Sequence, residues 1–261
     1  MTFESFLAQS GPSILIEVTA TKGSVPRDTG TFMLVSDTGI WGTIGGGNLE
    51  FAAIDKAGGM LASGAQSEKM RITLGPDSGQ CCGGVVELGL SVADDAAASR
   101  LKVRLTNEKL AFPDVYLFGA GHVGRALAVA LKPLPLHTVV VETRREELDG
   151  LDPDIETRLA AMPESLLRDV RPGGAVVILT HDHALDFLIG AEALKRDDLA
   201  YVGMIGSKTK RGVFSNWLIR EGYDDDMIDG LVLPIGGRKL RDKRPEVIAA
   251  LVAAELLGAL L

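Results

Sequence analysis

The stretch Tyr116–Leu131, YLFGAGHVGRALAVAL, decides the fold class of this chain. It places Gly119, Gly121 and Gly124 in the pattern G-x-G-x-x-G, between an apolar run and a segment with apolar residues at helical spacing. In such a strand–turn–helix unit one glycine permits the tight turn, a second lets the backbone approach a phosphate, and a third lets the helix pack closely. The unpaired N–H groups at the helix start favour an anion. The stretch therefore predicts a phosphate site.

The residues around this turn alternate between strand and helix patterns. The expected strands cover residues 115–119, 138–142, 155–159, 175–180, 200–205 and 231–235. Such alternation is typical of parallel βαβ units, and five or six strands favour a doubly wound, Rossmann-type parallel sheet. Because ligands of these sheets lie at the carboxyl ends of the strands, the segments that follow the strands are the candidate binding residues.

The first candidates follow the glycine turn and the next strand. Glu142 ends that strand 23 residues after Gly119, where a carboxylate usually binds ribose hydroxyls. Arg144 could hold an additional phosphate or belong to a solvated run of charge. His122 lies inside the turn and could donate to an anion or face solvent.

The segment THDHALD, residues 180–186, is expected to reach the same edge. On a strand His181 and His183 would face the same way, which suggests a metal site completed by Asp182 or Asp186, or a polar role beside a ligand. The alternative is a loop whose aspartates cap the following helix.

A further segment, GSKTKR at residues 206–211, follows another expected strand. Gly206 begins it, Ser207 can cap the next helix, and Lys208 adds positive charge at the helix start. These residues suit a ligand with several acidic groups.

The front half combines short strands with glycine turns. The expected strands cover residues 13–20, 31–36, 68–74 and 85–92, and Asn48 is expected to cap a helix that starts near Leu49. The polar residues 93–109 are expected to connect the halves. We therefore expect an N-terminal mixed α/β domain over residues 1–110 and a Rossmann-type domain over residues 111–261.

Two turns of the front half carry groups suited to an oxyanion. The loop TKGSVPRDTG adds two cations, and the turn in IGGGNLE is expected to expose several backbone N–H groups ahead of a glutamate. The candidates are Lys22, Arg27, Gly45, Gly46, Gly47 and Glu50.

The segment GQCCGG, residues 79–84, contains the two cysteines of the chain, next to Gln80. A thiolate can bind a transition metal or carry sulfur, and the flanking glycines allow close approach to a ligand. Cys81 and Cys82 cannot both face one ligand on an extended backbone, so either could be the functional one. The alternative is a pair of small buried side chains.

Composition narrows the class of protein. Among 261 residues, 46% are hydrophobic and 24% are charged, which is ordinary for a globular protein, and the formal net charge of −8 argues against binding to nucleic acid or to an anionic membrane surface. The apolar tail at residues 247–261 is too short for a membrane span. We recognise no signal peptide, and two adjacent cysteines do not form a disulfide framework, so we expect a cytoplasmic protein.

Six of these segments together resemble the XdhC family, the accessory proteins of xanthine dehydrogenase and related molybdenum hydroxylases. In family order they are TKGSVPRDTG, GTIGGGNLE, GQCCGG, VYLFGAGHVGRAL, LTHDHALD and YVGMIGSKTKR. The resemblance covers nearly the whole chain. It implies an XdhC/CoxI-type N-terminal domain followed by the Rossmann domain.

The resemblance also implies a function. Family members bind molybdenum cofactor, a pterin that carries a phosphate and a dithiolene-bound metal, with or without an added nucleotide. They protect this molybdopterin while a terminal sulfido ligand is installed with sulfur from a cysteine desulfurase, and deliver it to the apo-hydroxylase. We therefore expect the glycine turn to hold the phosphate or dinucleotide portion and Cys81 or Cys82 to approach molybdenum, in a homodimer without independent catalysis.

Two other functions use the same turn. An NAD(P)-dependent oxidoreductase with His181 or His183 as proton relay accounts for the Rossmann half but leaves the cysteine segment unexplained. An NAD(P)-binding regulatory module would change the affinity for a partner without chemistry.

Overall fold

The structure is a computed structural model that describes residues 1–75, 83–237 and 242–261. The chain divides into two compact units, Met1–Thr106 and Asn107–Leu261. The first unit is built on a five-stranded antiparallel sheet and the second on a six-stranded parallel sheet. The expected fold class, a mixed α/β domain followed by a Rossmann-type domain, is confirmed.

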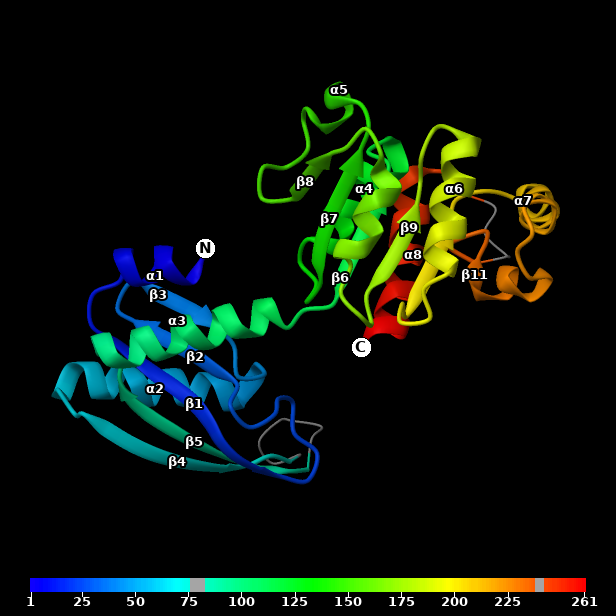
Figure 1. The fold of residues 1–261 in the computed structure, drawn as a ribbon. Coiled ribbons are helices and arrows are strands. Elements are labelled where there is room, and N and C mark those ends of the chain that lie inside the picture. The colour runs from blue at the N-terminus through cyan, green and yellow to red at the C-terminus, as the bar shows by residue number, and fades with distance from the viewer. Residues whose placement is uncertain (76–82, 238–241) are drawn as a thin grey trace. The chain divides into compact units, whose positions relative to one another are not determined.

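The sheet of the first unit has the strand order β3-β2-β1-β5-β4. Its strands are β1 (Ser13–Lys22), β2 (Phe32–Ser36), β3 (Gly39–Gly42), β4 (Ser67–Thr73) and β5 (Val85–Val92). Helix α2 (Gly47–Ser63) covers one face, and α1 (Phe3–Gln9) with α3 (Asp95–Leu110) covers the other (Figure 1). Successive residues of β1 alternate between these two cores, as the period of a strand requires.

The expectation that residues 93–109 form a polar connection is wrong, because they form most of α3. This helix buries a narrow stripe, with Ala97 and Leu101 one turn apart and Leu105 packed against the same core. Arg104 on this helix forms an ion pair with Glu17. Its other residues face solvent, which is why the stretch resembles a linker in sequence.

The expected start of α2 is also wrong. The helix begins at Gly47, with Gly46 in the N-cap position at φ +76°, so that Asn48 lies within the first turn. Glu50 reaches back to accept hydrogen bonds from the backbone N–H groups of Ile44 and Gly46, both at 3.1 Å. These bonds fix the turn ahead of the helix and replace the expected asparagine cap.

The sheet of the second unit has the order β11-β10-β9-β6-β7-β8. Its strands are β6 (Asp114–Phe118), β7 (His137–Glu142), β8 (Glu156–Leu159), β9 (Ala175–Ile178), β10 (Tyr201–Met204) and β11 (Leu231–Val232). The chain continues from β6 to β7 on one side and later places β9 on the other side of β6. The switch point of a doubly wound sheet, where ligands bind, therefore lies between β6 and β9.

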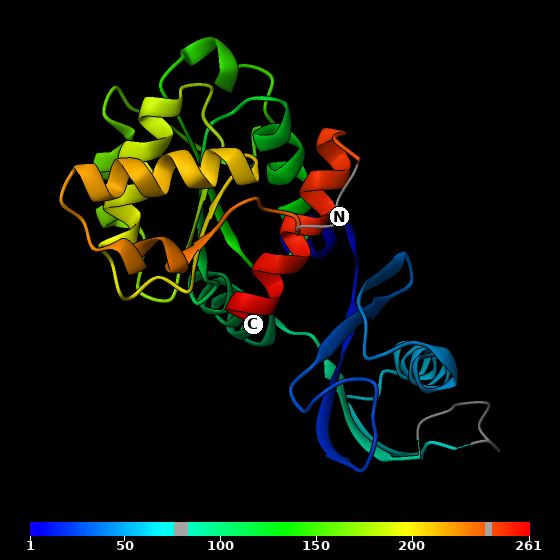
Figure 2. The same ribbon diagram turned by 90° about the vertical axis from the view of Figure 1, so that its right-hand side faces the viewer.

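Helices cover both faces of this sheet. Helices α4 (His122–Leu131) and α8 (Pro245–Leu260) lie side by side on one face (Figure 2). Helices α6 (His183–Leu194) and α7 (Lys208–Arg220) pack on the other, with the 3₁₀ helices η2 (Pro163–Asp169) and η3 (Asp225–Gly230). The short α5 (Arg145–Leu148) follows β7. The central strands β6, β9 and β10 are buried throughout, as expected for parallel strands covered on both faces.

The amino ends of three strands share a charged cluster. His137 lies between Asp114, with 2.8 Å from Nδ1 to Oδ1, and Glu156, with 3.1 Å from Nε2 to Oε2. Arg171 also binds both oxygens of Asp114, which is only 3% exposed. Burial would raise the pKa of Asp114, but hydrogen bonds from Arg171 and His137 outweigh it and lower this pKa to about 2.

This cluster makes stability depend on pH. Burial would lower the pKa of His137, but its hydrogen bonds to Asp114 and Glu156 outweigh burial and raise the pKa above that of a free histidine. The stabilisation by His137 is thus fully present below about pH 6.5, the pKa of the unfolded chain, and is lost as pH rises through the folded pKa. We expect the difference in unfolding free energy between wild type and His137→Asn, measured by urea titration, to shrink from pH 6 to pH 8. A difference that is constant or grows contradicts the assignment.

Candidate functional site

The three glycines of the turn between β6 and α4 have different surroundings. Gly119 has φ +123°, and a Cβ there would lie 2.6 Å from the carbonyl carbon of Leu179. A Cβ on Gly124 would lie 3.0 Å from the carbonyl carbon of Gly119 and closer still to its oxygen. Around Gly121, by contrast, no described atom lies within 4 Å of the Cβ position. The outer glycines therefore serve packing, and Gly121 leaves the backbone open to approach.

The start of α4 is suited to an anion. Gly121 is the N-cap residue and contributes no side-chain cap, so the first N–H groups of the helix have no side-chain acceptor from that position. His122, the first helical residue, is exposed. The sequence predicts a phosphate at this helix start, and the space beside Gly121 is compatible with that prediction.

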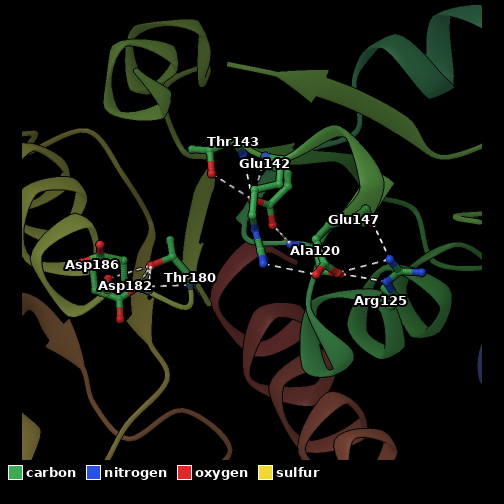
Figure 3. A network of polar contacts seen from close by, with 9 residues as sticks. Ala120, Arg125, Glu142, Thr143, Glu147, Thr180, Asp182 and Asp186 are labelled. Carbon is green, nitrogen blue, oxygen red and sulfur yellow. Dashed lines mark hydrogen bonds and ion pairs between the residues drawn. The ribbon is translucent and has the colours of Figure 1, made fainter. Parts of the chain in front are cut away.

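Glu142 lies under the turn rather than open to solvent, since its side chain is only 4% exposed. One carboxylate oxygen accepts from the N–H of Ala120 at 3.0 Å (Figure 3). The other accepts from the N–H of Thr143 at 2.8 Å and from the N–H of Arg144 at 3.2 Å. Burial would raise the pKa of Glu142, but these hydrogen bonds outweigh it and lower the pKa. The carboxylate is therefore ionised and holds the turn to the end of β7.

Arg125 also belongs to this site, although no sequence pattern indicated it. Its Nε donates to the carbonyl of Ala120 at 2.9 Å, and its other nitrogens reach the carbonyls of Glu147 at 2.7 Å and Asp149 at 3.3 Å. It thereby ties the glycine turn to the segment around α5 (Figure 3). Its position could have indicated this role. A cation near the start of a helix interacts unfavourably with the helix dipole, so Arg125 needs hydrogen-bond acceptors close by.

The expectation that His181 and His183 share a strand face is wrong. Strand β9 ends at Ile178, and His183 is already the first residue of α6. Asp182 caps this helix by accepting from the N–H groups of Ala184 and Leu185, and these bonds lower its pKa. The helix-capping alternative is therefore the correct one for Asp182. Both histidines are exposed.

A buried ion pair lies beside these histidines. Asp186 is fully buried and binds the ammonium group of Lys210, whose side chain is 9% exposed. Its other oxygen accepts from the N–H of Thr180 at 3.1 Å and from the Thr180 hydroxyl at 2.7 Å (Figure 3). The sequence suggested a metal ligand or a helix cap for Asp186 and did not reveal this pairing.

These groups line an open pocket of about 340 Å³, which we call the histidine pocket. Its lining includes Thr180, His181, His183, Asp186, Ser207 and Lys210. Gly206 also contributes, and Ser207 caps α7 as predicted, accepting from the N–H of Lys210 at 3.3 Å. Lys208 instead lines a separate pocket with Arg211 and Asp229.

The turns of the first unit lie together at one end of its sheet. A Cβ on Gly84 would lie 2.7 Å from the carbonyl oxygen of Lys22, and a Cβ on Gly45 would lie 2.6 Å from Cγ of Pro26. The loop after β1 therefore contacts both the triple-glycine turn, residues 45–47, and the start of β5. Lys22, the last residue of β1, and Arg27 on this loop are exposed.

The expectation that the triple-glycine turn offers free N–H groups is wrong for part of it. Glu50 accepts from the N–H groups of Ile44 and Gly46, and the hydroxyl of Thr43 accepts from Gly45 at 3.1 Å. Glu50 therefore stabilises the turn. Of the remaining candidates, Gly47 begins α2, and Gln80, Cys81 and Cys82 lie outside the described residues.

The described residues contain neither a metal-binding cluster nor a membrane-spanning helix. Within residues 1–75, 83–237 and 242–261, no group of three or more histidine, cysteine, aspartate or glutamate side chains could hold a metal ion. In the same part of the chain, no helix is both long and apolar enough to cross a membrane.

Comparison with known proteins covers both units. Residues 115–256 match a family model described as the XdhC Rossmann domain, and residues 6–73 match the XdhC and CoxI family. The chain is 29% identical over 265 residues to Uncharacterized protein YqeB of Escherichia coli (strain K12), covering 95% of this chain but 44% of that protein. The crystal structure of a xanthine dehydrogenase from Bacillus halodurans shares the fold with a TM-score of 0.78 at 20% identity, over 98% of this chain and 94% of that one. This chain belongs to the XdhC family.

Proposed function

We propose that this chain is an accessory protein of xanthine dehydrogenase or a related molybdenum hydroxylase, which binds molybdenum cofactor, supports its sulfuration and delivers it. The observation that carries the proposal is the match to XdhC models in both units. The Bacillus halodurans protein that shares this fold is described as a xanthine dehydrogenase, the enzyme system named in this proposal. The chain spans less than half the length of YqeB, so the partners and the cargo belong to this proposal.

The glycine turn fits the phosphate end of this cargo. The space beside Gly121 admits a phosphate to the backbone, and the start of α4 supplies N–H donors for it. His122, exposed at the first position of α4, can donate a further hydrogen bond. A phosphate held in this way needs no catalytic group, in keeping with a carrier that performs no reaction alone.

In this proposal the cysteine segment, residues 79–84, binds the molybdenum end of the cofactor. Cys82 directly precedes Gly83 and Gly84 in sequence, and Gly84 packs against the end of β1 at Lys22 and the loop that follows it. A thiolate is a soft ligand suited to molybdenum and to sulfur transfer. In this proposal a cysteine desulfurase supplies the sulfur, and the protein works as a cytoplasmic homodimer.

The test is to produce the protein together with the molybdenum cofactor pathway and to analyse what remains bound. We expect the wild type to retain molybdopterin, detected by fluorescence of the oxidised pterin, together with molybdenum, detected by metal analysis. Cys81→Ala or Cys82→Ala should lower the molybdenum content more than the pterin content, because the phosphate is held elsewhere. If neither cysteine variant changes the molybdenum content, the thiolate role is wrong. A wild type without pterin rejects the function itself.

A further inference from the structure

The two sides of the glycine turn differ in what they leave free for a ligand. A dinucleotide bound in the usual Rossmann manner places its adenosine ribose over the end of the second strand, where a carboxylate accepts from both ribose hydroxyls. That arrangement needs free acceptor positions on the carboxylate. The corresponding strand here is β7, and the carboxylate is that of Glu142.

Glu142 has at most one free acceptor position, on Oε2, whereas a diol needs two. A carboxylate offers about four lone-pair positions. Its Oε1 alone receives the N–H and hydroxyl of Thr143 at 2.8 and 3.1 Å and the N–H and Nε of Arg144 at 3.2 and 3.5 Å, while Oε2 receives the N–H of Ala120 at 3.0 Å. The side chain is also only 4% exposed. A ribose could bind it only by displacing bonds that hold the turn.

Two of the basic side chains next to the end of β7 also have partners within the protein. Arg144 forms an ion pair with Glu147 at 3.3 Å in addition to its bond with Glu142. Arg125 is bound to the carbonyls of Ala120 and Glu147. Of the basic side chains next to this strand end, Arg145 is exposed.

The other side of the turn is open. Thr180, which lines the histidine pocket, lies directly beside the turn, because its backbone nitrogen is 3.0 Å from the Cβ position of Gly119. The pocket offers about 340 Å³ and has two exposed histidines at its rim, while its ion pair of Asp186 and Lys210 is buried. Imidazole nitrogens can donate to or accept from the polar edge of a ring system.

We propose that a phosphorylated ligand held at the glycine turn extends toward β9 and β10 into the histidine pocket, and that the chain therefore takes a phosphomonoester and not a ribose-bound dinucleotide. The inference rests on the proposed function for the identity of the ligand, a pterin phosphate without an added nucleotide. The direction of the ligand rests on the contacts of Glu142 and on the pocket alone.

The test compares exposed side chains on the two sides of the turn. The double variant His181→Ala, His183→Ala removes the rim of the histidine pocket, and Arg145→Ala removes the exposed cation beside β7. Each protein is produced with the cofactor pathway and then diluted, and the pterin that stays bound is measured by the fluorescence of its oxidised form. Loss of two hydrogen bonds should weaken retention about tenfold in the double variant, and Arg145→Ala should stay within about twofold. Circular dichroism verifies that each variant is folded.

The opposite ranking, with retention lost in Arg145→Ala and kept in the histidine variant, overturns the inference. Calorimetric titration of the purified wild type with NAD⁺ provides a second readout. No saturable binding up to about 1 mM supports the inference, whereas a micromolar dissociation constant that Arg145→Ala weakens overturns it. If the wild type retains no pterin, the proposed function fails, and the NAD⁺ titration still decides the direction of the ligand.

Discussion

Alanine at Gly124 is expected to lower the free energy of unfolding by about 3 kcal/mol, whereas alanine at Gly121 should change it by less than about 1 kcal/mol. The new Cβ at position 124 meets the carbonyl of Gly119, which is part of the backbone and cannot rotate away. Relief requires the start of α4 to move off the strand. At position 121, φ is −67° and the Cβ position is free of described neighbours, so the fold tolerates a methyl group there.

In the proposed function, the same methyl group at Gly121 would occupy the space that the phosphate needs. We therefore expect Gly121→Ala to lose most of the retained pterin while remaining folded, and Gly124→Ala to lose pterin together with stability. Urea denaturation and pterin fluorescence on the same preparations separate the two effects. A Gly121→Ala protein that binds as the wild type does would show that the ligand does not approach the backbone at this turn.

The sequence predicted the second unit well because its signals are local. A glycine pattern and alternating apolar runs gave strands within a few residues of β6, β7, β9 and β10, since fully buried parallel strands need continuous apolar sequence. In the first unit, α3 was missed because only Ala97 and Leu101 are buried in it. Two buried residues one turn apart are too short a pattern to distinguish a helix from a linker.

The sequence predicted which segments follow the carboxyl ends of the strands, but not the contacts of their side chains. The carboxyl ends of β6, β7, β9 and β10 do carry the polar segments that the sequence placed there. The partners of these residues depend on side-chain direction, which spacing does not reveal. Glu142 faces the glycine turn, and Glu50 faces the triple-glycine turn, so each satisfies N–H groups that sequence patterns left open.

The second large effect concerns the ion pair under the histidine pocket. In Asp186→Asn, the amide oxygen can still accept from Thr180, but the ammonium group of Lys210 loses its counter-charge while remaining mostly buried. Breaking a buried pair on one side costs about 3–5 kcal/mol, because an uncompensated charge stays in the interior. We expect a loss of this size in urea denaturation.

The control is the double variant Asp186→Asn, Lys210→Met, which removes the stranded charge and keeps the aliphatic length. It should recover about half or more of the lost stability, since an apolar side chain of similar volume is tolerated where a lone ammonium is not. The remaining loss reflects the bond from Lys210 to the carbonyl of Ile205 at 2.8 Å, which methionine cannot make. A double variant less stable than Asp186→Asn would mean that Lys210 stabilises α7 mainly through that carbonyl. The attraction between Asp186 and Lys210 would then contribute little to stability. The hydrogen bond from Lys210 to the carbonyl of Ile205 would be the main contact that stabilises this part of the histidine pocket.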